Sequence, residues 1–163
     1  MIINTKKIKV ISCITTLLIM ALIFWFSSQN SVDSSATSKG FSMWLLSIVK
    51  PQLLYAERAE LAADMSHMIR KFAHFSMYAA LGMSSAAAVS SISGKPVRKI
   101  LMLSVLFCAA YAVTDEIHQM FVGGRAGMVG DVLIDTAGAA TGGVLMMLAI
   151  SIIRYIRKKK VNE

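Results

Sequence analysis

Charged residues are scarce in this chain, and acidic ones are the scarcest. Asp, Glu, Lys and Arg make up 16% of its 163 residues, and only 9 residues are acidic. Soluble globular domains contain about 25% charged residues, whereas 56% of this chain is hydrophobic. The composition disfavours an ordinary soluble domain, and the length suits a single domain over residues 1–163.

Cysteine and proline are also rare, with two of each. Cys13 and Cys108 lie inside apolar stretches, without the pairing or spacing of a disulfide framework or a metal cluster. We interpret both as small hydrophobic residues. Pro51 is expected to end a helix, and Gly94-Lys95-Pro96 is expected to form a compact turn.

The apolar residues concentrate in four stretches that are each long enough to cross a membrane. They are Ile8–Phe26, Phe72–Ile92, Ile100–Val122 and Val129–Ile153. A helix of about 20 residues spans the roughly 30 Å of a bilayer's hydrocarbon core. The pattern predicts an all-α integral membrane protein, a four-transmembrane-helix bundle. The first stretch is long for a signal peptide and lacks a clear cleavage site, so we expect it to remain as a helix.

The net charge of +8 is compatible with a nucleic-acid partner, but its distribution favours a membrane instead. Eleven of the 17 Lys and Arg residues form three clusters, which alternate with the apolar stretches. The clusters are Lys6, Lys7 and Lys9; Lys95, Arg98 and Lys99; and Arg154, Arg157, Lys158, Lys159 and Lys160. The positive-inside rule places all three in the cytoplasm, together with both termini. The loops at about 27–70 and around Arg125 are then outside, and no nucleic acid is expected.

The long outer loop is predicted to contain short extracellular helices. It starts with a polar segment at 27–38 that we interpret as flexible. An apolar stripe at helical spacing follows, made of Phe41, Trp44, Leu45, Ile48 and Val49. This helix either lies on the outer membrane surface or packs its stripe on the bundle. A second short helix, Gln52–Met68, is expected to lead into the second span.

The later spans are joined by short turns, so spans two, three and four should be antiparallel neighbours. The outer turn contains Gly123-Gly124-Arg125-Ala126-Gly127. The fourth span carries Gly138 and Gly142, and also Ala139 and Gly143, at four-residue spacing. Small residues at this spacing let helices approach closely in lipid, and we interpret them as packing residues.

Polar and ionisable residues gather at one end of these three spans. In the second span a single helical stripe contains His67, Lys71, His74, Tyr78, Gly82 and Ser85. The third ends in a polar group of Asp115, Glu116, His118 and Gln119. The fourth begins with Asp131 and Asp135, which are four residues apart and share a face. In the predicted topology all three groups, and Arg125, lie toward the outside.

Two interpretations of this cluster follow from its depth in the membrane. A charge at the bilayer centre costs at least roughly 2.5–3.5 kcal/mol, so such groups usually face the bundle interior. One interpretation is a structural ion-pair network between Lys71 or Arg125 and nearby acids. The other, which we favour, is a water-accessible binding pocket open to the outside. Its predicted residues are Lys71, His74, Tyr78, Asp115, Glu116, Gln119, Arg125, Asp131 and Asp135.

At these residues the chain resembles the VanZ-like family of integral membrane proteins. The matching segments are Lys71-Phe-Ala-His74-Phe-x-x-Tyr78-x-x-Leu81-Gly82, Asp115-Glu116-Ile-His118-Gln119 with Arg125 after it, Asp131-Val-Leu-Ile-Asp135-x-x-Gly138, and Phe26-Ser27-Ser28-Gln29. The resemblance covers roughly residues 8–150. The chain departs from it at Gly123-Gly124, where many members have Pro-Gly, and at Asp135, where many have Asn.

The resemblance implies a multi-pass protein of the bacterial plasma membrane that acts at the cell envelope. The family is named for a member linked to resistance to teicoplanin, a lipid-tailed glycopeptide antibiotic. The first hypothesis is therefore binding or shielding at the outer leaflet, which lowers susceptibility to such antibiotics. Besides the lipid bilayer, the partner would be a lipid-linked cell-wall precursor or the lipoglycopeptide itself.

The alternative hypothesis is a hydrolase or transferase that acts on a lipid-linked envelope substrate. Its catalytic candidates are His74, Asp115, Glu116 and His118, with a histidine as general base and water as nucleophile. A metal site is less favoured. Its candidate ligands His67, His74 and His118, with the nearby carboxylates, follow no known ligand spacing. A transporter is disfavoured because polar groups at one end provide no continuous path. The sequence leaves the cofactor, the substrate and the oligomeric state open.

Overall fold

The computed structural model describes residues 5–124 and 127–161, which contain five helices and no strand. The helices are α1 (Thr5–Ser27), α2 (Ser31–Val49), α3 (Tyr55–Ile92), α4 (Val97–Gln119) and α5 (Val129–Val161). All except α2 are long and apolar enough to cross a membrane. The predicted all-α membrane bundle is confirmed.

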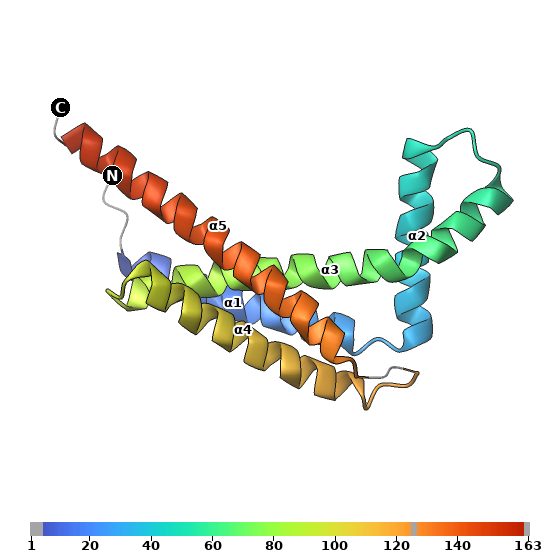
Figure 1. Ribbon diagram of the computed structural model, residues 1–163, viewed down its shortest axis with the longest axis horizontal. Coiled ribbons are helices and arrows are strands. Elements are labelled where there is room, and N and C mark those ends of the chain that lie inside the picture. The colour runs from blue at the N-terminus through green and yellow to red at the C-terminus, as the bar shows by residue number, and fades with distance from the viewer. Residues whose placement is uncertain (1–4, 125–126, 162–163) are drawn as a thin grey trace.

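The four long helices run side by side, with both termini at one end of the bundle (Figure 1). Helix α2 and the turn between α4 and α5 lie at the opposite end, which we call the α2 end. Helices α3, α4 and α5 contact one another, and α1 packs mainly on α3. The predicted antiparallel packing of spans two, three and four is confirmed. Helix α4 starts directly after Pro96, as the predicted turn requires.

Helix α2 differs from its prediction in extent and in its buried face. It begins at Ser31 rather than near Phe41, so the serine-rich segment is helical and not a flexible exit. The Asn30 side chain caps it by accepting a hydrogen bond from the Asp33 backbone N–H. Its buried residues occur at every fourth position: Ser34, Ser38, Ser42 and Leu46.

The apolar stripe of α2 is exposed. Phe41, Trp44 and Ile48 are each at least half exposed, so the alternative that the stripe packs on the bundle is wrong. Small serine side chains form the contact with α3 instead. The hydroxyls of Ser38 and Ser42 donate to the carbonyls of Ser34 and Ser38 in the same helix, which pairs these two donors at the contact. A large apolar surface therefore remains at the α2 end.

The expected second short helix is the first half of α3. A turn at 50–54 follows α2, and α3 then continues unbroken for 38 residues from Tyr55 to Ile92. No proline lies within α3 and its first glycine is Gly82, so nothing in the sequence interrupts it. Helix α4 ends at Gln119, three residues before the predicted boundary, and α5 continues past Ile153 to Val161.

Glycines hold α3 and α5 unusually close together. A Cβ on Gly82 would lie 2.1 Å from the carbonyl oxygen of Ala139, and one on Gly138 would lie 2.3 Å from that of Phe75. A Cβ on Gly142 would lie 1.8 Å from the carbonyl oxygen of Ala79. The interpretation of Gly138 and Gly142 as packing residues is confirmed, and Gly82, which the sequence placed on the polar stripe, adds a third close contact. Because this contact runs beside the polar stripe of α3, it also fixes how far that stripe stands from α5.

Candidate functional site

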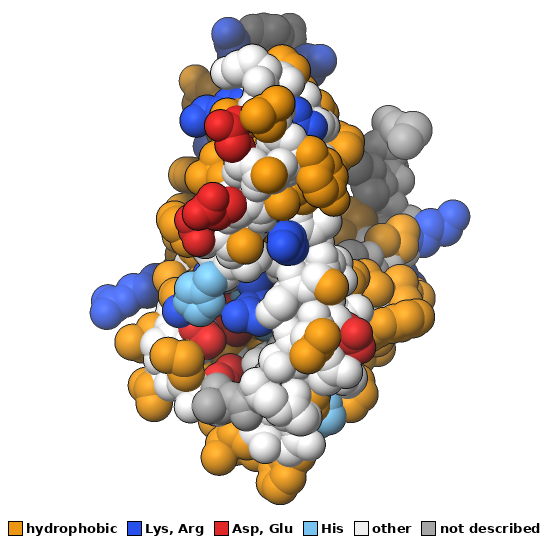
Figure 2. All heavy atoms as spheres, turned by 90° about the vertical axis from the view of Figure 1, so that its right-hand side faces the viewer, with side chains coloured by type: hydrophobic (Ala, Val, Ile, Leu, Met, Phe, Trp, Pro, Cys, Tyr) orange, Lys and Arg blue, Asp and Glu red, His pale blue; other side chains and the backbone are white. Residues whose placement is uncertain are grey.

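A cavity of about 240 Å³ lies at the α2 end, between α2, α3, α4 and α5. Figure 2 views this end, where acidic, basic and histidine side chains gather around a hollow in the surface. The cavity is lined by Ser31, Ser35, His67, Arg70, Lys71, His74, Glu116, Gln119, Gly124, Met128, Asp131, Ile134 and Asp135. Segments of α3, α4 and α5 that lie far apart in the sequence thus meet at one site, as the sequence pattern indicated, and α2 adds Ser31 and Ser35.

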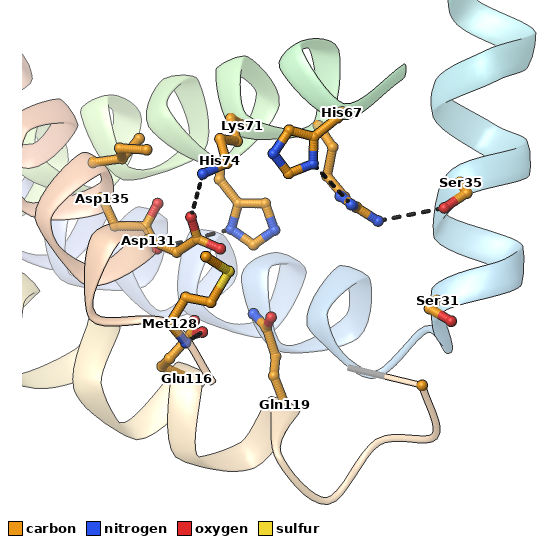
Figure 3. Close-up of a pocket in the computed structure, with 13 residues that line it drawn as sticks. Ser31, Ser35, His67, Lys71, His74, Glu116, Gln119, Met128, Asp131 and Asp135 are labelled. Atoms are coloured by element: carbon orange, nitrogen blue, oxygen red, sulfur yellow. Dashed lines mark hydrogen bonds and ion pairs between the residues drawn. The ribbon is translucent and has the colours of Figure 1, made fainter. Parts of the chain in front are cut away.

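Two pairs of side chains connect α3 to α5 across the cavity (Figure 3). Lys71 Nζ lies 3.0 Å from Asp131 Oδ1, and both side chains are about one third exposed. One turn deeper, His74 Nδ1 lies 3.8 Å from Asp135 Oδ2, and the Asp135 side chain is almost fully buried. A partly solvated pair such as Lys71–Asp131 typically contributes at most about 1 kcal/mol to stability. This pair therefore contributes little to holding the bundle together.

Asp115 lies in the interior beside the cavity and is 3% exposed. Its Oδ2 atom accepts hydrogen bonds from Ser27 Oγ of α1 at 2.8 Å and from Gln119 Nε2 at 3.1 Å. Both donors are neutral and both are buried, so they orient the carboxylate without neutralising it. Ser27 brings α1 into the site, although α1 does not line the cavity.

Three buried oxygens beneath the cavity have no hydrogen-bond partner among the described residues. They are Oδ1 of Asp115, Oδ1 of Asp135 and the hydroxyl oxygen of Tyr78. Tyr78 is fully buried, and its side chain is within electrostatic range of both carboxylates. Buried polar groups in proteins are almost always paired, so these three oxygens call for a partner.

Glu116 closes the turn between α4 and α5. Its Oε1 atom accepts a hydrogen bond from the backbone N–H of Met128, the residue before α5 begins. A carboxylate is favourable at the start of a helix, where the helix dipole is positive. Gly124 belongs to this turn and has a φ of +76°, a backbone conformation in which any other residue would be strained.

The predicted site residues divide into three groups. Six of them line the cavity: Lys71, His74, Glu116, Gln119, Asp131 and Asp135. Tyr78 and Asp115 lie buried beneath it. Arg125 lies outside the described residues.

The candidate histidines have different surroundings. His118 is absent from the cavity lining, because its ring stacks on Phe24 at 4.6 Å and its Nε2 lies 3.2 Å from Ser28 Oγ. His67 is exposed at the cavity rim, where its Nδ1 lies 3.3 Å from Arg70. In the described chain, His74, Asp115 and Asp135 form a group whose ligand-type atoms all lie within 4.8 Å of one another. Of the three histidines, His74 is therefore the one placed among the buried carboxylates.

Sequence reasoning missed several residues of the site. Arg70 lines the cavity and donates to Ser35 Oγ at 3.4 Å, and Ser31 also lines it. These contacts depend on how α2 docks, which no periodicity reveals. Ser27 is different, because it stands in the Phe26-Ser27-Ser28-Gln29 segment that already matched the family pattern.

The comparison with protein families decides what kind of protein this is. A model of the VanZ/LLP1 family matches residues 12–151. The chain belongs to the VanZ/LLP1 family. The match contains every residue of the cavity lining, so the site lies wholly within the family region of this VanZ-like membrane protein. No curated protein and no solved structure matches the chain.

Proposed function

We propose that this VanZ-like protein resides in the bacterial plasma membrane with the α2 end outside. All three basic clusters belong to the end of the bundle that carries the termini, which supports a cytoplasmic position for that end. Counting about 20 residues back from Ile92 along α3 reaches residue 73, near the outer boundary of the hydrocarbon core. The cavity then opens to the outside at the level of the lipid headgroups.

Reporter fusions test this orientation directly. A reporter after Lys99 or at the C-terminus is expected to give a cytoplasmic signal, and one inserted in the 50–54 turn an external signal. The physical reason is the cost of moving clustered Lys and Arg across the bilayer. An external signal from the C-terminus would reverse the topology and place the cavity on the cytoplasmic side.

Within this orientation the protein binds the polar part of a lipid-tailed envelope molecule in the cavity. The observation that carries this proposal is the arrangement at the α2 end. Ionisable side chains line the cavity, and the exposed stripe of Phe41, Trp44 and Ile48 forms an apolar surface on α2. Such an arrangement matches a molecule with a polar head and a lipid tail. A lipid-linked cell-wall precursor or a lipoglycopeptide such as teicoplanin has this chemistry, and binding or shielding it would lower susceptibility to the antibiotic.

Antibiotic binding to cells tests this function. Expression of the protein in a susceptible bacterium is expected to raise the inhibitory concentration of teicoplanin and to reduce the binding of fluorescent teicoplanin. A glycopeptide without a lipid tail should be affected less. Lys71→Gln should abolish the effect, because it removes a charge from the cavity, whereas Lys39→Gln on the exposed part of α2 should not. Equal effects of the two substitutions on teicoplanin would contradict a role for the cavity.

A catalytic function is the second candidate, and one contact favours it. His74 Nδ1 faces Asp135 at 3.8 Å, an arrangement that orients an imidazole for general-base catalysis. The reaction would be hydrolysis or group transfer on a lipid-linked envelope substrate. Turnover of precursor lipids by the purified protein, lost in His74→Ala, would favour the enzyme. Unchanged precursor lipids with altered antibiotic binding would favour shielding.

A further inference from the structure

The three unpartnered buried oxygens and His74 belong to one small region beneath the cavity. Asp115 comes from α4, Asp135 from α5, and His74 and Tyr78 from α3. Both carboxylates are nearly fully buried, at 3% and 2% exposure. Among the described residues, no Lys or Arg forms an ion pair with either one, since the ion pair of Lys71 is with Asp131. Two adjacent carboxylates in such a place require compensation by a proton or by a cation.

We propose that His74, Asp115 and Asp135 bind one divalent transition-metal ion of the Zn²⁺ or Mn²⁺ type at the floor of the cavity. One imidazole nitrogen and two carboxylate oxygens suit cations of borderline to hard character. A dication compensates two carboxylates. This inference departs from the sequence-based expectation, which gave no metal site and named His67 and His118 among the candidate ligands.

The geometry is close to that of a coordinated ion. Metal–ligand bonds of about 2.1 Å separate ligand atoms by about 3.0–3.4 Å. His74 Nδ1 and Asp135 Oδ2 are 3.8 Å apart, and the ligand-type atoms of all three residues lie within 4.8 Å. Small rotations of the side chains would close the set around an ion. The glycine contacts between α3 and α5 already set the spacing of His74 and Asp135.

The surroundings of Asp115 also resemble the support of a metal ligand. Metal-binding carboxylates are usually held by hydrogen bonds from outer residues. Ser27 and Gln119 both donate to Oδ2 of Asp115, while Oδ1 has no partner in the described chain. His74 and Asp135 also line the cavity, so an ion between them would keep a coordination position open to it. That position suits water or an anionic group, such as a phosphate or carboxylate of the bound molecule.

This inference rests on the proposed function, because the metal would bind in the same cavity as the envelope molecule. Metal binding is nevertheless measured without any antibiotic. The full chain, purified in detergent and stripped with a chelator, is titrated with Mn²⁺ or Zn²⁺ in equilibrium dialysis. About one ion per chain is expected. Asp135→Asn and His74→Asn should each weaken binding at least tenfold, the scale of lost metal-site interactions. The control Asp131→Asn removes a carboxylate from the same cavity without removing a proposed ligand, so it should weaken binding less than Asp135→Asn does. His67→Asn, at the cavity rim, should weaken it less still.

A spectroscopic measurement on the unmodified protein covers the case in which a variant fails to fold. Pulsed EPR of the Mn²⁺ complex should show coupling to one imidazole nitrogen. Absent or substoichiometric binding, missing nitrogen coupling, or equal weakening by Asp131→Asn and Asp135→Asn would overturn the metal site. Teicoplanin binding by a chain that takes up no metal would overturn this inference alone. Metal binding without any effect on teicoplanin would overturn the proposed function alone.

Discussion

Gly142→Ala is expected to destabilise the folded bundle strongly. The added Cβ would lie 1.8 Å from the carbonyl oxygen of Ala79 and 2.6 Å from its carbonyl carbon, both backbone atoms of α3. No rotation of a side chain can relieve such a contact, so α3 and α5 would have to separate by more than 1 Å. Overpacking typically costs about 1–3 kcal/mol, and a clash between two backbones lies at the top of that range or above it.

The measurement is the amount of monodisperse protein after detergent extraction, with its thermal unfolding. Gly40→Ala is the matched control, since a Cβ at Gly40 in α2 meets nothing within 4 Å. Alanine there should leave stability unchanged or raise it by about 0.5–1 kcal/mol, the usual gain from replacing glycine inside a helix. If Gly142→Ala extracts and unfolds like Gly40→Ala, the close approach of α3 and α5 is wrong.

Asp115→Asn is expected to remove function while leaving the metal-free protein at least as stable. The asparagine keeps a carbonyl oxygen for the hydrogen bonds from Ser27 and Gln119. It also removes a charge that is 97% buried and has no ion pair with Lys or Arg in the described chain. Burying an uncompensated charge costs several kcal/mol, so stability should stay equal or rise by about 1 kcal/mol or more.

Thermal unfolding in chelator and teicoplanin susceptibility, measured on the same variant, test this expectation. The opposite result would come from the structural ion-pair network, in which breaking a pair costs about 3–5 kcal/mol. Loss of folding together with function in Asp115→Asn would therefore support the network. Normal folding with normal susceptibility would remove Asp115 from the site. Asp64→Asn on the exposed face of α3 serves as the control for neutralising an acid.

The spans and the depth of the polar cluster could be predicted because they depend on local patterns. Apolar length and the positions of Lys and Arg define the helices, and four-residue spacing places Asp131 and Asp135 on one face. The glycine contacts were predictable for the same reason. Each of these features requires only the chain's own periodicity.

Contacts that depend on docking could not be predicted. The stripe of Phe41, Trp44 and Ile48 was compatible with a face packed on the bundle or with one on the membrane surface. Only the packing of the serines on α3 shows that the stripe is exposed. The pairing of Ser27 with Asp115 joins residues 88 positions apart. His118 was a candidate catalytic residue, but it does not reach the cavity. Each position along a helix turns the side chain by about 100°, so His118, next to Gln119 in sequence, points to α1 instead.

The unbroken course of α3 limits where this protein can tolerate changes in length. The helix carries the buried Ala62 on its outer half and His74 and Tyr78 farther along the same rod. One residue inserted between Ala62 and Arg70 would turn the outer half, with the α2 that docks on it, by about 100° relative to the site. An insertion of seven residues, close to two full turns, would nearly restore the rotational orientation of the two halves of α3 while lengthening the helix by about 10 Å. Insertions in the 50–54 turn would leave the orientation of α3 unchanged, so we expect length differences among related chains to occur mainly in this turn.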